Sequence, residues 1–383
     1  MIRTKISRRT VLMGTAGVTA LGALHAPAIA QQGGEPIKIG AVLCLTGPGA
    51  GLGQAERSAM QLAEKMVNEA GGVNGRPIRV LIEDDGSKPD IAKSKAEALI
   101  FNEKVPLMIG SSLTASTGAI AALTNGEKMA QVALTGLGPA IELTYKSLYH
   151  VLPPQPLNAR AMLEYTKAQN FKKIGVLHDS GYGQLVYNSL REQAAAYGVS
   201  FAAVEKFEVG AQDVSTQAAK VRAAQPEAVY VIATSPVPFR GARQVRITQP
   251  IISAIGSSPY DYVRGMGEYA DDIVFPEFLV GEDPEPHQKA FVDMYKAAYN
   301  SLPKNYEAAG WDALQIAVNA LKKAGPTDRE AIAQAMREPY RGVMASYNFA
   351  APDLTGIELS SFVFSKLVKT QFTRLPFKVT ARS

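Results

Sequence analysis

Short apolar runs alternate with longer amphipathic segments along most of this chain, and the whole series occurs twice. The first series precedes Pro153-Pro154, and the second begins directly after that pair. Strands that alternate with helices form parallel sheets, because a parallel pair needs a crossover between its two strands. The pattern therefore predicts an α/β protein with two doubly wound parallel-sheet lobes, which suits a length of 383 residues.

The individual elements follow from the period of the apolar residues. We expect strands at residues 37–45, 78–82, 105–110, 132–135, 149–152, 173–177, 201–207, 228–232, 251–253, 273–276, 346–349 and 362–367. We expect helices at residues 54–70, 89–102, 119–129, 157–169, 184–197, 214–224, 239–248, 286–300, 305–323 and 327–337.

The first thirty residues have the features of an export signal. Ser7-Arg8-Arg9 forms a twin-arginine pattern, an apolar segment runs from Val11 to Leu24, and Ala28-Ile29-Ala30 offers a small-residue cleavage site. This apolar segment is shorter than the roughly 20 residues that a membrane span needs. We therefore expect a signal peptide over residues 1–30, cleaved near Ala30, and a mature protein outside the cytoplasm.

The positive charge of the chain comes mostly from this signal. The full sequence carries a formal net charge of +5, and the signal contributes four basic residues and no acidic one. The basic isoelectric point therefore does not indicate a nucleic-acid partner. The single cysteine, Cys44, lies in an apolar run and is expected to be a buried small hydrophobic residue.

The segment from Val105 to Gly118 is the strongest candidate for a binding site. Its predicted buried strand breaks at Gly110 into a turn rich in Ser and Thr, and a helix follows. The free backbone N–H groups of a helix's first turn can bind an anion, while hydroxyl side chains can instead cap the helix. The turn alone leaves both interpretations open.

Other patterns indicate enzyme chemistry only weakly. Gly47–Gly53 follows a strand, but the spacing G-x-G-x-x-G fails at its sixth position. His178-Asp179-Ser180 cannot converge as a catalytic triad, and one cysteine without paired histidines does not make a zinc site. Glu83-Asp84-Asp85 is expected to be a solvated loop or a helix cap. We therefore expect no cofactor and no metal.

Several motifs, taken in order, resemble the periplasmic substrate-binding proteins of branched-chain amino acid ABC transporters, the type I periplasmic binding protein family. The motifs are Ile37–Pro48, Asn68-Glu69-Ala70-Gly71-Gly72-Val73-Asn74-Gly75-Arg76, Glu83–Asp85, and Asp179 with Tyr182-Gly183. The resemblance spans nearly all of the mature sequence. It implies two lobes joined by three crossovers, which close over a small ligand by a hinge motion, and it implies no catalytic step.

The resemblance also implies how the chain is divided and where it acts. It implies an N-terminal lobe of residues 35–153 plus 278–348 and a C-terminal lobe of residues 154–277 plus 349–383. The crossovers would fall near 152–155, 275–279 and 347–351. We expect a periplasmic monomer that docks on the membrane permease of an ABC transporter and has no nucleic-acid partner.

The resemblance places the carboxylate of the ligand at the turn after the third strand. Thr114 falls on the family's hydroxyl position, with Ser112 and Leu113 just before it. A second carboxylate contact falls on the turn with Leu137, Gly138 and Pro139, where the hydroxyl is missing and only backbone groups could serve. Two aromatic positions of the family are kept, as Tyr182 and Tyr306.

The partner for a ligand ammonium looks absent. Amino-acid receptors of the family present a carboxylate after the last inner strand of the second lobe, and here Ile255, followed by Gly256, stands in that loop. Burying an ammonium there without a partner would cost several kcal/mol. Thr234 replaces an aromatic residue, and apolar surface is expected from Leu52, Leu137, Pro139, Pro236 and Ile255. We therefore expect a small carboxylate ligand without an α-amino group, such as a 2-oxo acid or an aromatic carboxylate.

Three alternatives stay open. An amino acid receptor of the same family would need an acidic residue from elsewhere, and Asp261 and Glu282 are the nearest candidates. A sensor ectodomain would signal instead of delivering its ligand. A dinucleotide-dependent exported enzyme would use the glycine-rich run at 47–53.

Overall fold

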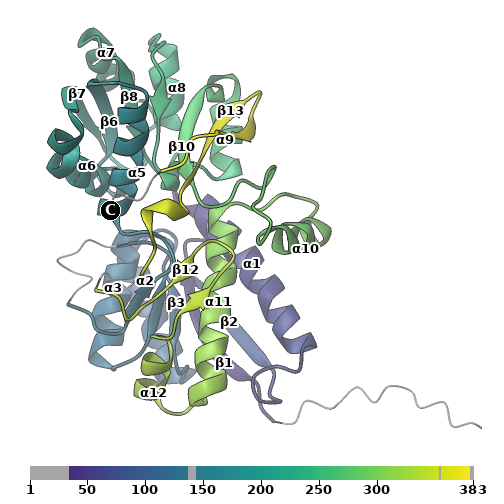
Figure 1. Cartoon of the computed structure of the whole chain (residues 1–383). Helices are drawn as coiled ribbons and strands as arrows, with labels where there is room; N and C mark the ends of the chain where they lie inside the picture. The colour runs from purple at the N-terminus through teal and green to yellow at the C-terminus, as the bar shows by residue number, and fades with distance from the viewer. Residues whose placement is uncertain (1–33, 137–143, 353–354, 380–383) are drawn as a thin grey trace, which may run out of the picture.

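The computed structural model of this chain describes residues 34–136, 144–352 and 355–379. It consists of two α/β lobes stacked one above the other, with the chain passing between them more than once (Figure 1). The predicted signal peptide and the predicted ligand contacts Leu137, Gly138 and Pro139 lie outside the described residues.

The first lobe is built on five parallel strands in the order β2-β1-β3-β4-β5. Both faces of β1 are covered, so its residues Ile39 to Leu43 are all buried or nearly so, as expected for a parallel sheet. The strands are β1 (Ile37–Leu43), β2 (Ile78–Asp84), β3 (Met108–Gly110), β4 (Gln131–Ala133) and β5 (Leu148–His150). The first helices of the lobe are α1 (Ala50–Glu69), α2 (Pro89–Glu97), which continues as a π-helical turn Ala98–Asn102, and α3 (Thr114–Gly126).

The second lobe is built on seven strands in the order β14-β13-β10-β9-β8-β6-β7, of which the five from β6 to β10 are parallel. These strands are β6 (Lys173–Asp179), β7 (Ser200–Phe207), β8 (Ala228–Ile232), β9 (Ile251–Ile252) and β10 (Ile273–Glu277). Their helices are α5 (Gln155–Ala168), α6 (Tyr182–Gln193), α7 (Ser215–Ala223), α8 (Val237–Gln244) and α9 (Tyr260–Met266). Short 3₁₀ turns cover Ala194–Tyr197, Ile255–Ser257, Gly267–Ala270 and Leu359–Ser361.

After β10 the chain returns to the first lobe and later joins the second sheet again. The returning helices are α10 (Lys289–Tyr299), α11 (Asn305–Ala324) and α12 (Arg329–Ala335), followed by the two-stranded ribbon of β11 (Tyr340–Arg341) and β12 (Ser346–Tyr347). Helix α11 lies against α1 so closely that a Cβ atom at Gly310 would stand 2.5 Å from the Glu56 carbonyl oxygen. The last strands, β13 (Val363–Val368) and β14 (Gln371–Arg374), pair antiparallel at the edge of the second sheet.

The glycine-rich run differs from the expectation of a loop. Helix α1 begins at Ala50, so Gly51 and Gly53 are helical, and a Cβ at Gly53 would lie 2.3 Å from the Cys44 carbonyl oxygen. The glycines therefore allow close packing of a helix on the end of a strand. Cys44 is fully buried, as predicted, and its thiol donates to the Gly49 carbonyl at 2.9 Å.

The acidic run Glu83-Asp84-Asp85 lies at the end of β2 and is not a solvated loop, which corrects that part of the expectation. Asp85 is completely buried and accepts hydrogen bonds from the Ser111 hydroxyl and the Ser87 amide, both at 2.7 Å. Asp84 accepts from the Thr46 hydroxyl at 2.7 Å and from the Leu45 amide at 2.9 Å. The two carboxylates hold together three neighbouring loops at the carboxyl edge of the first sheet.

Candidate functional site

Each sheet contains one topological switch point, and the switch point of one lobe faces that of the other. In the first sheet the strand order reverses between β1 and β3, and in the second between β6 and β8. Loops that leave such neighbouring strands run in opposite directions and open a crevice at their carboxyl ends, where α/β proteins bind ligands. The site is therefore expected among the loops after these four strands.

A cavity of about 170 Å³ lies at this position, between the two lobes. It is well below the roughly 300–1,000 Å³ of pockets that hold drug-sized ligands. The first lobe contributes most of the wall and the second lobe the opposite side. The lining residues are Pro48, Gly49, Leu52, Ser87, Pro89, Ser112, Leu113, Thr114, Ala115, Ser116, Gly181, Tyr182, Val209, Thr234 and Tyr306.

Helix α3 presents an uncapped N-terminus to this cavity. Its N-cap residue is Leu113, which has no side-chain oxygen, and the first intrahelical bond runs from the Thr117 amide to the Leu113 carbonyl at 2.8 Å. The amides of Thr114, Ala115 and Ser116 are therefore without intrahelical acceptors. Three such N–H groups at the positive end of a helix suit an anion such as a carboxylate.

Two hydroxyl groups stand beside these amides. The Ser116 hydroxyl is buried and has no hydrogen-bond partner among the described residues, although it lies in the cavity wall. The Thr114 hydroxyl has only long contacts, at 3.3 Å to the Thr135 hydroxyl and to the Gly136 carbonyl. Both hydroxyls are therefore available to a ligand at little cost to the protein.

The wall of the second lobe is centred on Tyr182. Its hydroxyl oxygen accepts hydrogen bonds from the Asn158 side chain at 2.8 Å and from the Gly256 amide at 3.1 Å. Asp179 fixes the two loops beside it, because its carboxylate accepts from the amides of Gly181, Gly183 and Thr234. These bonds hold the aromatic ring at the cavity in a defined position.

Tyr182 and Tyr306 approach the site from different lobes. Tyr306 lies near the start of α11 and is 5% exposed, and Tyr182 opens α6. Burial raises the pKa of both phenols, so each keeps its proton at physiological pH. The pair offers aromatic surface and neutral hydroxyl groups, and no charge, to whatever the cavity holds.

Among the described residues, the wall of the cavity contains no charged side chain. The two acidic residues named above as possible ammonium partners are both engaged elsewhere. Asp261 pairs with Arg264, and Glu282 accepts from the Tyr260 hydroxyl at 2.9 Å and from the Phe372 amide. Neither lines the cavity.

The structure brings together seven of the thirteen residues that we predicted for the site. Leu52, Ser112, Leu113, Thr114, Tyr182, Thr234 and Tyr306 all line the cavity. Pro236, Ile255 and Gly256 are not part of its wall. The remaining three, Leu137, Gly138 and Pro139, lie outside the described residues.

The three residues beyond the wall have other surroundings. Pro236 packs against Gly265, and Ile255 is 3% exposed within the apolar core. Gly256 supports the site indirectly through its hydrogen bond to Tyr182. They belong to loops that do reach the switch point, but a loop's position does not tell which of its side chains faces the ligand.

Sequence reasoning missed eight residues of the wall. Several are small or apolar residues whose neighbours in the chain were predicted, so the loops were identified while the contacting atoms were not. The missed residues are Pro48, Gly49, Ser87, Pro89, Ala115, Ser116, Gly181 and Val209.

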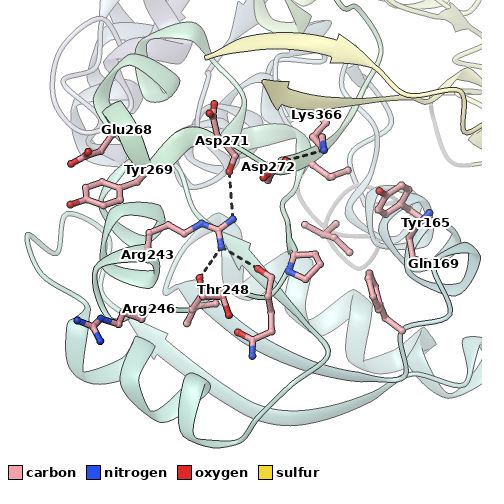
Figure 2. Close-up of a pocket in the computed structure, with 16 residues that line it drawn as sticks. Tyr165, Gln169, Arg243, Arg246, Thr248, Glu268, Tyr269, Asp271, Asp272 and Lys366 are labelled. Carbon is pink, nitrogen blue, oxygen red and sulfur yellow. Dashed lines mark hydrogen bonds and ion pairs between the residues drawn. The ribbon is translucent and has the colours of Figure 1, made fainter. Parts of the chain in front are cut away.

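A larger hollow of about 710 Å³ lies elsewhere, on the second lobe. Thr248, which precedes β9, and Asp271 and Asp272, which precede β10, line it (Figure 2). It therefore lies at the amino ends of these strands, the opposite edge of the sheet from the switch point. Two of its cationic side chains are engaged within the protein. Arg243 donates to the carbonyls of Ile247 and Gln249, and Lys366 pairs with Asp272 at 2.9 Å. Arg246 and Glu268 also line the hollow. It lies away from the carboxyl ends of the strands, where parallel α/β sheets bind their ligands, so we do not place the site there.

No helix among the described residues is long and apolar enough to cross a membrane. The same part of the chain holds no group of three or more His, Cys, Asp or Glu side chains that could bind a metal ion.

Two α/β lobes that enclose a small cavity between their switch points define a two-lobed solute-binding protein. The chain belongs to the periplasmic binding protein family, whose pattern matches residues 36–363. The match confirms the resemblance drawn from the motifs and the two-lobed fold. It also confirms that the chain is a binding protein and not an enzyme.

Individual relatives agree with this assignment. The chain is 24% identical over 314 residues to the leucine-, isoleucine-, valine-, threonine- and alanine-binding protein of Pseudomonas aeruginosa, covering 79% of this chain and 82% of the relative. The substrate-binding protein LivJ of a branched-chain amino acid transporter from Streptococcus pneumoniae, solved with isoleucine, superposes with a TM-score of 0.80 at 23% identity, over 89% of this chain and 100% of that one. A solute-binding protein of an ABC transporter from Rhodopseudomonas palustris, solved with benzoate, superposes with a TM-score of 0.79 at 18% identity, over 89% and 95% of the two chains.

Proposed function

We propose that this protein is the periplasmic receptor of an ABC importer and captures a small carboxylate that has no α-amino group. An aromatic carboxylate or a 2-oxo acid would be held between the lobes and released to a membrane permease when the hinge opens. One observation carries the proposal. The uncapped N-terminus of α3 faces a small interlobe cavity whose described wall contains no acidic side chain.

The charge of the wall is what separates the two ligand classes. An α-amino acid carries an ammonium that needs a carboxylate partner once it is removed from water, because an unpaired buried charge is costly. The α3 amides and the Ser116 hydroxyl suit the carboxylate of either class of ligand. Only a ligand without the ammonium would leave no unpaired charge in the described wall.

The size and surface of the cavity favour a compact, partly apolar ligand. Leu52, Leu113 and Pro48 line the cavity of about 170 Å³ together with Tyr182 and Tyr306. Aromatic rings pack favourably against one another in offset or edge-to-face arrangements. Relatives of this fold have been solved with isoleucine and with benzoate, so the architecture accommodates both an amino acid and an aromatic acid.

The proposal is tested by thermal-shift measurements with matched ligand pairs. Leucine is compared with 4-methyl-2-oxopentanoate, phenylalanine with phenylpyruvate, and benzoate with benzamide, which lacks the negative charge. We expect the protein to be stabilised by an acid without an amine and to be unaffected by the corresponding amino acid and by benzamide. Ligands that bind only the native state raise its melting temperature by mass action.

The opposite result would overturn the ligand class. Stabilisation by leucine or phenylalanine, with none by the oxo acids or by benzoate, would assign the protein to amino acid binding. Mass spectrometry of the ligand that co-purifies with the protein, released by denaturation, gives an independent answer because it needs no choice of candidates.

A further inference from the structure

A buried glutamate lies directly behind the carboxylate-binding turn. Glu56 is on the inner face of α1 and is completely buried. One of its carboxyl oxygens, Oε2, lies 2.5 Å from the Ser112 hydroxyl, and the other, Oε1, has no hydrogen-bond partner among the described residues. Glu56 does not line the cavity, but Ser112 does.

Within the described part of the chain, the titratable groups close enough to act on the charge of Glu56 are acidic or neutral. They are the Cys44 thiol at the end of β1, the Asp85 carboxylate after β2, Glu307 and Tyr306 on α11, and Tyr262 on α9. None of them is a cation, so an ionised Glu56 would be a buried charge without a counter-ion. Burial raises the pKa of the Glu56 carboxyl well above its usual range, the Ser112 hydrogen bond opposes this, and the charges of Asp85 and Glu307 raise the pKa further.

The protonation state of Glu56 decides what Ser112 can offer a ligand. A serine hydroxyl has one proton to donate and two lone pairs that accept. The Cys44 amide already donates to the Ser112 oxygen at 3.2 Å. If Glu56 carries a proton, its O–H donates to Ser112 as well, and the serine proton is left free for a ligand.

We propose that Glu56 is a positioning residue. It does not touch the ligand and acts on it only by orienting the Ser112 hydroxyl. Its carboxyl stays protonated and donates to the Ser112 oxygen, so that the Ser112 O–H points toward the ligand carboxylate. If Glu56 loses its proton, Ser112 donates to Glu56 and turns a lone pair toward the ligand, beside a new negative charge. This inference rests on the proposed function, because it assumes an anionic ligand.

The first test needs no ligand and examines the proton itself. The infrared difference spectrum between the wild-type protein and Glu56→Gln, recorded in D₂O at neutral pH, is expected to show the C=O band of a protonated carboxyl group. The matched control is Glu64→Gln, a half-buried glutamate on the same helix that accepts from the Val80 amide at 3.2 Å. Absence of the band from the Glu56 difference spectrum would overturn the proposal.

The second test follows affinity against pH by titration calorimetry with benzoate and 4-methyl-2-oxopentanoate as probes. Wild-type affinity is expected to fall as pH rises into the range where Glu56 ionises, and Glu64→Gln to follow the same profile. Glu56→Gln keeps a neutral N–H donor on Ser112, so its affinity is expected to stay constant over that range. Ser112→Ala is expected to bind about 10- to 100-fold more weakly, the loss for a hydrogen bond to a charged group.

Two results separate the failure of this inference from the failure of the proposed function. If a folded Glu56→Gln protein loses probe binding at every pH, or if it keeps the wild-type pH profile, the positioning role is wrong. If neither probe binds to any variant while leucine does, the ligand class is wrong, and the infrared band alone then decides the state of Glu56.

Discussion

At the scale of single residues, the hydroxyl side chains at the start of α3 have two different roles. Some form hydrogen bonds within the protein, and others are left for a ligand. Ser116 and Thr117 are neighbours and both are buried, yet their hydroxyls differ. Thr117 donates to the Ser111 carbonyl at 2.9 Å, whereas Ser116 has no partner among the described residues. A hydroxyl that is buried without a partner costs stability unless a ligand or water completes it.

This difference predicts that three similar substitutions affect different properties, two of them affinity and the third stability. Ser116→Ala and Thr114→Val are each expected to weaken carboxylate binding by roughly 1.5–3 kcal/mol with little change in melting temperature. The matched change Thr117→Val is expected to lower stability by about 1 kcal/mol, since it removes a hydrogen bond within the protein. Calorimetric titration and thermal unfolding of the three variants measure both quantities. Unchanged affinity in Ser116→Ala and Thr114→Val would mean that the turn is only structural.

The sequence could predict some of these residues and not others. Thr114 and Ser112 were predicted because the family resemblance places the ligand carboxylate at the turn after the third strand, and the structure places both in the cavity wall. Ser116 lies in the same stretch, but a linear pattern does not tell which hydroxyls turn inward. Glu56 falls on the apolar stripe of α1, with Leu52, Ala59 and Ala63, and a charged residue on such a stripe was the signal that could have found it.

At the scale of elements, the alternation of strands and helices was sufficient to predict the two sheets. It was not sufficient to predict several short elements. Strands β11 and β14 and helix α9 were not predicted, since each is only two to seven residues long and gives too short a periodic pattern to recognise. Each of the two strands pairs with its neighbour in the chain, β11 with β12 and β14 with β13. The start of α1 was placed four residues late because glycines are poor helix formers. Packing against Cys44 requires them there, so tertiary contact overrides propensity.

The close packing at Gly53 can be measured. Gly53→Ala would place a Cβ 2.3 Å from a backbone oxygen that cannot move aside, so we expect a loss of about 1–3 kcal/mol or more in unfolding free energy. Gly126→Ala, at the end of α3 with no atom within 4 Å of the new Cβ, is the control and is expected to be neutral or slightly stabilising. Urea denaturation measures the unfolding free energy of both variants. Equal stability of the two would show that α1 can shift away from β1.

At the scale of the whole molecule, a buried polar cluster joins the lobes where the chain leaves β10. Glu277 ends β10 in the second sheet, and its carboxylate lies 2.6 Å from the Lys304 ammonium at the start of α11. Both side chains are at most 2% exposed. The hydroxyls of Ser258 and Ser365, from the second lobe, also donate to Glu277. The family resemblance places a crossover near 275–279, but it does not pair residues 27 positions apart in the chain.

Removing one partner of this pair is expected to destabilise both lobes together. Lys304→Met leaves the Glu277 carboxylate buried without its cation, which typically costs about 3–5 kcal/mol. The double variant Lys304→Met/Glu277→Gln removes both charges and is expected to recover much of that loss, because the glutamine oxygen still accepts from one serine and its NH₂ group can donate to the hydroxyl oxygen of the other. The control is Lys128→Met, which breaks an exposed pair with Glu330 and should cost no more than about 1 kcal/mol.

Urea unfolding, followed by the fluorescence of Trp311 and by circular dichroism, measures the stability of all three variants. Because the cluster connects the lobes, Lys304→Met is expected to shift both signals to the same lower urea midpoint. A shift in one signal alone would mean that the lobes unfold independently of this pair.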